Sequence, residues 1–174
     1  ESPLSPFYSR TIVDPDFAAK LTGKIGKTSF GILAASDNAP GNYSEDERTE
    51  LEICQQRRLT NPALRCGVEE FLDKNALFGV VRVKRDFGKN NNVGFFGTAR
   101  TFPKNRNFVG GFDGTFKLDD ATVMTFQVLG THSRKNFFDR DFFLRDDMSR
   151  GPSPYRPGNG FGYSFTLDRT KDTH

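Results

Sequence analysis

The sequence has no tryptophan and few of the side chains that build metal and redox sites. Its 174 residues include two cysteines, two histidines and two methionines. A structural zinc site needs about four clustered ligands, and neither His132 nor His174 has clustered partners in the sequence. We therefore expect no metal and no cofactor, and we expect both histidines to lie at a rim or an end of the fold.

Long apolar runs and runs of one charge are also missing. No stretch approaches the roughly 18 consecutive apolar residues of a transmembrane helix. The 25 basic and 22 acidic residues nearly balance, and no run holds only Lys and Arg, so no nucleic-acid partner is expected. The start, ESPLSPFYSR, has neither the charged nor the apolar region of a signal peptide. The chain begins without Met, and we expect a fragment of a longer protein.

Helix signals are scarce. The segment 44–58, SEDERTELEICQQRR, starts with Ser44, has Glu47 three residues later, and contains no Gly or Pro. This pattern predicts a helix that opens with a capping box. Almost all the rest predicts strands separated by Gly, Asn, Asp and Pro.

Seven long strands are expected, and they give an all-β fold. A hairpin covers 18–36, and the five strands after it are about nine to thirteen residues long. Ordinary strands have about 5–6 residues, whereas a tilted strand that crosses a bilayer needs about 9–11. We predict an antiparallel up-and-down meander. Its five later strands cover 76–88, 92–101, 107–118, 122–133 and 161–169.

Apolar and polar residues alternate most clearly after residue 106. The alternation predicts one outward and one inward set of side chains, and it is typical both of a half-buried soluble sheet and of a lipid-facing barrel wall. The pattern alone therefore leaves both folds open. The outward set is Phe108, Phe112, Phe116, Phe126 and Phe165, and the inward set is Gly111, Asp113, Thr115, Thr125, Gln127 and Thr166.

The lengths of the connections favour the barrel. Short turns at IGK, GKNNN and LDDA alternate with longer connections at about 38–75, at FPKNRN and at about 134–160. In a meander this order puts the short turns on one rim and the longer loops on the other, as in outer-membrane barrels. We expect residues 1–174 to form a single partial β-barrel domain with loop insertions at about 38–75 and 134–160. A soluble sheet or sandwich stays open as the alternative.

Several blocks of the sequence resemble a known family. SPFYSRTIV, AAKLTGKIGKTSFGILAAS, VVRVKRDFGKNNNVGFFGTART and NFVGGFDGTFKL, in this order, are similar to the C-terminal domain of unknown function DUF5916. The resemblance implies a bacterial outer-membrane β-barrel with lipid as its partner. Many members carry an upstream domain similar to carbohydrate-binding family 9, which is absent here and would bring a carbohydrate partner. The sequence departs from the family at Thr11 and in the insertion that holds the cysteines.

A barrel wall needs a polar interior. The polar residues at every second position of the strands are candidates to face it. Lipid tolerates no open sheet edge, and bacterial single-chain barrels have an even number of strands, from eight upward. Seven strands should therefore form only part of a wall. The candidate interior-facing binding residues are Lys20, Lys24, Arg82, Lys84, Asp113, Lys117 and Gln127.

Nothing in the sequence predicts catalysis. There is no G-x-S-x-G motif, and the family has no catalytic motif to transfer. The acidic segment 139–151 does not match the spacing of a calcium loop; its carboxylates are Asp139, Asp141, Asp146 and Asp147. We expect a barrel fragment that serves uptake, anchoring or surface binding linked to carbohydrates. Part of a glycoside hydrolase-like protein and a soluble β-sandwich binding module are the alternatives.

Cys54 and Cys66 are the only cysteines and lie within the first long insertion. An exported protein passes through an oxidising compartment, where two thiols in one loop tend to pair. We therefore predict a disulfide between them, and two free thiols, one of them packed under the helix, stay open as the alternative. On the chain-entropy model, closing a loop of this size stabilises the fold by about 3 kcal/mol.

Overall fold

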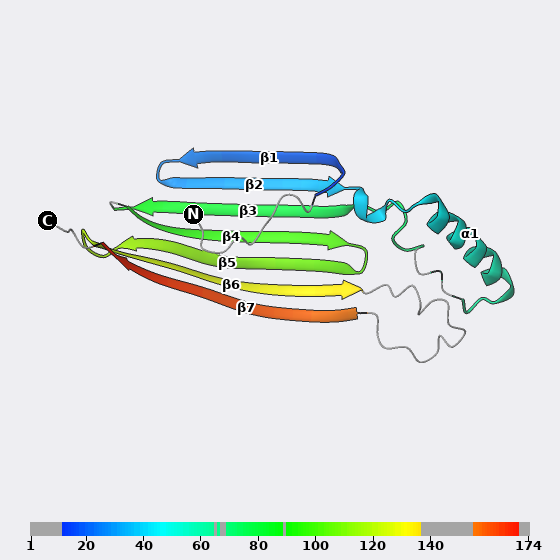
Figure 1. The fold of residues 1–174 in the computed structure, drawn as a ribbon. Coiled ribbons are helices and arrows are strands. Elements are labelled where there is room, and N and C mark those ends of the chain that lie inside the picture. Colours follow the sequence, from blue (N-terminus) through cyan, green and yellow to red (C-terminus); the bar gives the residue numbers. More distant parts are fainter. Residues whose placement is uncertain (1–11, 65, 67–68, 89, 137–154, 171–174) are drawn as a thin grey trace.

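The computed structural model describes residues 12–64, 66, 69–88, 90–136 and 155–170 (Figure 1). Seven antiparallel strands form one sheet in the order β1-β2-β3-β4-β5-β6-β7. Strand order follows chain order, so the expected seven-stranded meander is confirmed. The elements are β1 (Pro15–Ile25), β2 (Thr28–Asp37), the 3₁₀ turn η2 (Ala39–Gly41), α1 (Glu45–Thr60), β3 (Ala76–Phe87), β4 (Asn91–Phe102), β5 (Asn105–Lys117), β6 (Thr122–Asn136) and β7 (Tyr155–Arg169).

The sheet is open within the described part of the chain. Strands β1 and β7 form its two edges, and each pairs with only one neighbour, β2 or β6. Closure into a barrel is therefore not observed. Helix α1 lies beyond one end of the strands rather than over a face of the sheet (Figure 1).

The helix begins as the sequence predicts. Ser44 Oγ accepts a hydrogen bond from the Glu47 N–H at 3.4 Å, and a Glu47 carboxylate oxygen accepts one from the Ser44 N–H at 2.9 Å. This reciprocal pair satisfies two backbone donors at the helix start. The helix runs two residues past the expected end, to Thr60, with Arg57 and Arg58 in the last turn. Their positive charge is favourable beside the negative end of the helix dipole.

Two of the predicted connections are shorter than expected. The segment FPKNRN was predicted to be a medium-length loop, but only Pro103 and Lys104 lie between β4 and β5. Lys104 adopts a left-handed φ of 58°, which lets the chain reverse within the two residues Pro103 and Lys104. The second insertion was placed at 134–160, whereas β6 continues to Asn136 and β7 starts at Tyr155. Backbone pairing continues there although the apolar alternation has ended.

The other end of the sheet, where β1 connects to β2, β3 to β4 and β5 to β6, carries only short turns, as predicted. Gly26, Gly88 and Asn90 adopt left-handed φ angles of 58°, 60° and 67°. Gly and Asn tolerate this conformation best, which explains the composition of IGK and GKNNN.

The pairing register separates the side chains into two faces, because residues directly opposite in a sheet point to the same side. One row joins Leu21, Ile32, Val81 and, further along, Phe161. We call the side that carries this row the apolar face and the other side the polar face. The predicted outward phenylalanines all lie on the apolar face, and the predicted inward residues all lie on the polar face.

The apolar face carries most of the exposed large hydrophobic side chains. Of the described residues, nineteen large hydrophobic side chains are exposed, and all but Val13, Ile53, Leu59 and Leu118 belong to strands. Every one of the remaining fifteen lies on the apolar face. They are Phe17, Leu21, Ile25, Ile32, Leu77, Val83, Phe87, Phe95, Phe108, Phe112, Val128, Phe161, Tyr163, Phe165 and Leu167.

Aromatic rings cover glycines on the neighbouring strand. The Phe30 ring lies over its partner Gly23, and the Phe126 ring lies over its partner Gly114. A Cβ added at Gly114 would lie 2.6 Å from the Phe126 ring and 3.0 Å from the backbone oxygen of Asn92. The missing side chains of these glycines therefore leave room for the rings. Pairing a ring with a glycine on the neighbouring strand helps to fix the strand register.

Replacing Gly114 with Val should displace the Phe126 ring. We expect a loss of about 1–3 kcal/mol in the free energy of unfolding, as for other overpacked sites. Gly130→Val is the matched control, because a Cβ at Gly130 meets nothing within 4 Å. Its effect should stay within about 0.5 kcal/mol. Urea denaturation of both variants tests this, and equal losses would contradict the role of the ring.

Candidate functional site

The polar face carries all seven candidate interior-facing binding residues. One row across the sheet contains Lys24, Lys84, Asp113 and Gln127, each in register with its neighbours through Ser29 and Gly94. Arg82 lies on the same face in the next row, and Lys20 and Lys117 lie two rows away in opposite directions along the strands. The sequence therefore predicted the shared side of these residues, and their role in binding stays a prediction.

A two-point ion pair lies at the centre of this face. The guanidinium of Arg82 donates to the two carboxylate oxygens of Asp113, with N–O distances of 2.6 and 2.5 Å. Arg82 Cζ lies 5.9 Å from the centre of the Phe96 ring, which adds a cation–π contact. Asp113 is 8% exposed, and its cross-strand neighbour Gln127 is fully buried. Two-point arginine–carboxylate pairs have fixed geometry, so this one holds β3 and β5 together across β4.

Gly94 makes that ion pair possible. It lies in register between Lys84 and Asp113. A Cβ there would lie 2.5 Å from an Asp113 carboxylate oxygen and 2.8 Å from an Arg82 guanidinium nitrogen. The missing side chain thus leaves the space in which Arg82 reaches over β4 to Asp113. Reasoning from sequence missed Gly94 and Phe96, because their roles depend on strand register.

The charges near the short-turn rim form looser pairs. Asp86 lies 3.6 Å from the Lys24 ammonium and 3.9 Å from that of Lys84. Lys117 donates to Asp120 at 2.7 Å, and the Asp120 side chain is fully exposed. Exposed pairs of this kind contribute about 0–1 kcal/mol. They make the rim hydrophilic and add little rigidity.

Asp37 is a second buried carboxylate, and reasoning from sequence missed it. It ends β2, is 1% exposed, and accepts backbone hydrogen bonds from Val13 at 3.2 Å, Asp14 at 2.8 Å and Ala39 at 3.3 Å. The bond from Ala39, two residues on, is the usual Asx turn, so the sequence SDNAP was an available signal. Asp37 joins the approach to β1 to the start of the first insertion.

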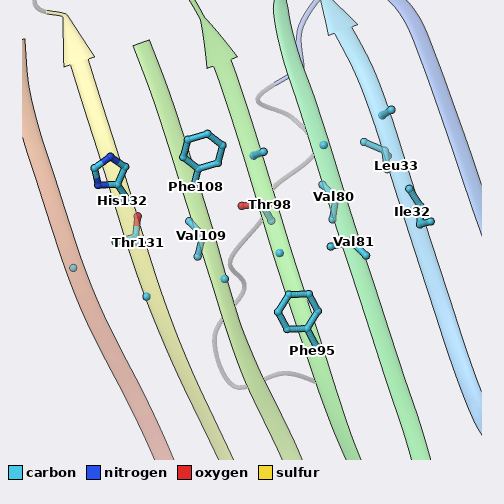
Figure 2. Close-up of a pocket in the computed structure, with 17 residues that line it drawn as sticks. Ile32, Leu33, Val80, Val81, Phe95, Thr98, Phe108, Val109, Thr131 and His132 are labelled. Atoms are coloured by element: carbon cyan, nitrogen blue, oxygen red, sulfur yellow. The ribbon is translucent and has the colours of Figure 1, made fainter. Parts of the chain in front are cut away.

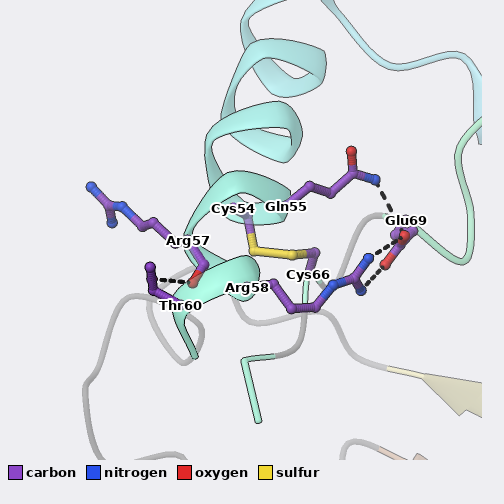
Figure 3. The surroundings of a disulfide bond; sticks show 7 residues. All are labelled: Cys54, Gln55, Arg57, Arg58, Thr60, Cys66 and Glu69. Carbon is purple, nitrogen blue, oxygen red and sulfur yellow. Dashed lines mark hydrogen bonds and ion pairs between the residues drawn. A yellow bond between two sulfur atoms is a disulfide. The ribbon is translucent and has the colours of Figure 1, made fainter. Parts of the chain in front are cut away.

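The first insertion has its own crosslinks (Figure 3). Cys54 and Cys66 form the disulfide that the sequence predicts, with their Cα atoms 5.8 Å apart. Close to it, Glu69 accepts two hydrogen bonds from Arg58, at 2.6 and 3.0 Å, and one from Gln55 at 3.2 Å. The hydrogen bonds from Arg58 lower the pKa of Glu69 below its ordinary value of 4.5. Disulfide and ion pair thus fasten the last turn of α1 to the returning chain.

Acid should loosen this insertion. Because the pKa of Glu69 is lowered in the folded state, its contribution to stability is complete above pH 4.5 and is lost as the pH falls through the lowered value. We expect hydrogen exchange of the α1 amides, corrected for intrinsic rates, to accelerate between about pH 6 and pH 3. Glu69→Gln should exchange faster at pH 6 and depend less on pH. An unchanged pH profile in that variant would contradict the assignment.

The remaining candidates are the two histidines and the carboxylates of the second insertion. Asp139, Asp141, Asp146, Asp147 and His174 lie outside the described residues. His132 lies on the apolar face, where its Nδ1 is 2.6 Å from Asn159 Oδ1. Among the residues that the structure describes, no group of three or more His, Cys, Asp or Glu side chains could hold a metal ion.

Comparison with known proteins adds no assignment. No helix in the described ranges is long and apolar enough to cross a membrane. Comparisons with protein-family models, with curated proteins and with solved structures found no match. The resemblance to DUF5916 therefore stays a prediction, and function has to be argued from the two faces of the sheet.

Proposed function

We propose that the chain forms part of the wall of a bacterial outer-membrane β-barrel. The apolar face would contact lipid, and the polar face would line the interior. The observation that carries the proposal is that all fifteen exposed large hydrophobic side chains of the strands share one face. Monomeric soluble proteins rarely expose apolar patches larger than a few hundred Å², so this face needs a cover. Lipid would cover it along the whole length of the strands.

The polar face has the properties of a barrel interior. The ion pair between Arg82 and Asp113 and the buried Gln127 would be costly against lipid but suit a polar lumen. Lys24, Lys84 and Asp86 add charge near the short-turn rim. Such a lumen would guide or hold a polar solute, which fits uptake, anchoring or surface binding. The proposed link to carbohydrate depends on the resemblance to DUF5916 alone.

The open edges limit how the barrel closes. Every pairing in the sheet is antiparallel, so β1 and β7, the first and seventh strands, run in the same direction. Antiparallel closure therefore requires an odd number of further strands between these edges. One such strand would reach the minimum of about eight for bacterial barrels. The further strands are part of the proposal.

A glycoside hydrolase is less well supported. Such enzymes use two carboxyl groups about 5–9.5 Å apart that flank the scissile bond. On the polar face, Asp113 is held by Arg82 and Asp86 lies beside two lysines. No catalytic residue is therefore proposed.

Cysteine labelling tests the placement of the faces. Phe112→Cys and Thr115→Cys put thiols on the apolar and polar faces of β5, and the native disulfide leaves Cys54 and Cys66 without free thiols. In bilayers, we expect a label at 112 to be quenched by a lipid-phase quencher and one at 115 to be quenched from water. The reverse pattern would overturn the facing. A soluble sandwich would instead purify without detergent and shield position 112 from both quenchers.

A further inference from the structure

The middle of the polar face carries an excess of positive charge. Four consecutive rows across the sheet, from the row of Ala35 to the row of Ser29, contain five cationic side chains and one carboxylate, that of Asp113. We call the five cations the basic patch. They are Lys20, Lys24, Arg82, Lys84 and Arg100.

Two members of the basic patch have uncharged surroundings in their own rows. The row of Lys20 continues through Leu33, Val80, Thr98, Val109 and Thr131, which can be followed from strand to strand in Figure 2. In the next row, Arg100 Cζ lies 5.5 Å from the centre of the Phe78 ring. Among the residues that the structure describes, neither Lys20 nor Arg100 forms an ion pair.

Burial increases the imbalance at the surface. Asp113 is 8% exposed, whereas the side chains of Lys24 and Lys84 are 60% and 43% exposed. The carboxylates in the two flanking rows are already engaged. Asp86 lies beside Lys24 and Lys84, and Asp37 accepts hydrogen bonds from three backbone N–H groups. The charge that this part of the face presents to solution is therefore mainly positive.

The basic patch occupies only one half of the polar face. In the same four rows, β6 and β7 carry no charged side chain. Their residues there are Gln127, Leu129, Thr131, Ser133, Gly158, Gly160, Gly162 and Ser164. A solute on this face would thus meet cations over β1, β3 and β4, and hydroxyl groups, an amide and open backbone over β6 and β7.

We propose that the polar face binds small hydrophilic anions, with the negative group at the basic patch and the uncharged polar groups toward β6 and β7. The proposal rests on the barrel proposed above, in which this face lines the lumen. Charge complementarity selects the solute, because a surface with charge of one sign concentrates ions of the opposite sign. Lysine and arginine likewise line the pores that select anions.

A matched pair of thiols measures the charge that a solute meets. Ser29 lies in register between Lys24 and Lys84, and Ser164 ends the same row on β7. Both serines are half-buried, so Ser29→Cys and Ser164→Cys differ mainly in their charged neighbours. In the full chain in a non-ionic detergent, each thiol is modified with an anionic sulfonatoethyl and a cationic trimethylammonioethyl thiosulfonate. We expect the ratio of the anionic to the cationic rate to be about tenfold higher at position 29 in about 0.1 M salt.

Charge variants test whether the basic patch causes this ratio. Lys24→Gln combined with Lys84→Gln should lower the ratio at position 29 to that at position 164. Lys74→Gln combined with Lys104→Gln is the control, because it removes the same charge outside the strands. Equal ratios at positions 29 and 164, or an equal fall in the control, would overturn the proposal.

Two sugars that differ by one carboxylate test binding itself. Modification of the thiol at position 29 by uncharged iodoacetamide is followed with sodium glucuronate or with glucose, at one ionic strength set with sodium chloride. At about 10 mM, glucuronate should slow the reaction about fivefold, as for a site of roughly millimolar affinity. Glucose should have no effect. Equal protection by both sugars, or protection by neither, would overturn the proposal.

The two levels of the proposal fail separately. If the quenching pattern at 112 and 115 holds while glucuronate gives no protection, the anion site is wrong and the barrel proposal stands. If the quenching pattern is reversed, the proposed facing has failed, whatever the thiol rates.

Discussion

Replacing Asp113 with Ala is expected to lower the free energy of unfolding by about 3 kcal/mol. Breaking a buried ion pair costs about 3–5 kcal/mol because one charge stays buried without its partner. The lower end applies because the Arg82 side chain is 35% exposed and keeps some contact with water. Urea denaturation of the full chain in detergent measures the loss.

The control for this prediction is Asp86→Ala, which removes another carboxylate from the polar face. The Asp86 side chain is 44% exposed and its two lysine partners lie 3.6 and 3.9 Å away, so the expected loss is about 0–1 kcal/mol. Arg82→Met combined with Asp113→Ala should be less destabilising than the sum of the two single changes, since no charge is then left without a partner. Equal losses for Asp113→Ala and Asp86→Ala would contradict the central role of the ion pair.

Replacing Asp37 with Ala is the second large effect, again about 3 kcal/mol. The change removes the acceptor of three backbone N–H groups, from Val13, Asp14 and Ala39, at a position that is 1% exposed. A hydrogen bond to a charged group contributes about 1.5–3 kcal/mol, and the part-buried donors regain some of this from water. Hydrogen exchange at residues 13, 14 and 39 should accelerate together with the loss of stability.

Asp14→Ala is the matched control for Asp37. The Asp14 side chain is exposed and, among the residues that the structure describes, accepts one long hydrogen bond, at 3.5 Å, from the Asn38 amide. Removing it should change stability by no more than about 0.5 kcal/mol. Asp37→Asn keeps one acceptor oxygen, so its loss in the free energy of unfolding should lie between those of Asp14→Ala and Asp37→Ala. A loss in Asp14→Ala as large as that in Asp37→Ala would show that the segment itself, not the carboxylate, sets the stability.

The seven strands and the helix start could be predicted because local chemistry sets them. Alternating side chains determine which residues of a strand share a face, so Phe112 and Asp113 were assigned to opposite sides correctly. Ser44 and Glu47 are three residues apart and satisfy each other within one turn. Strand ends were less predictable. Pairing between Asn136 and Tyr155 uses backbone groups, which the side-chain pattern does not report.

The candidate site could be predicted only as a set of residues on one side. Lys24, Lys84 and Asp113 were expected to face the same way, and the register places them in one row. Their partners could not be predicted. Whether Arg82 meets Asp113 or another carboxylate depends on how β3, β4 and β5 slide past one another, and a shift of one residue would turn every side chain to the other face.

The sequence by itself determined the number of strands, their two-sided character, the short-turn rim and the pairing of the only two cysteines. Each of these follows from residues that are neighbours in the chain or are the only ones of their kind. The tertiary structure decided the register, and with it the gap at Gly94 that Arg82 crosses and the alignment of Gly97, Gly110 and Gly130 across three strands. These features join residues on different strands, and such contacts exist only once the backbone hydrogen bonds between strands have set which residues are opposite.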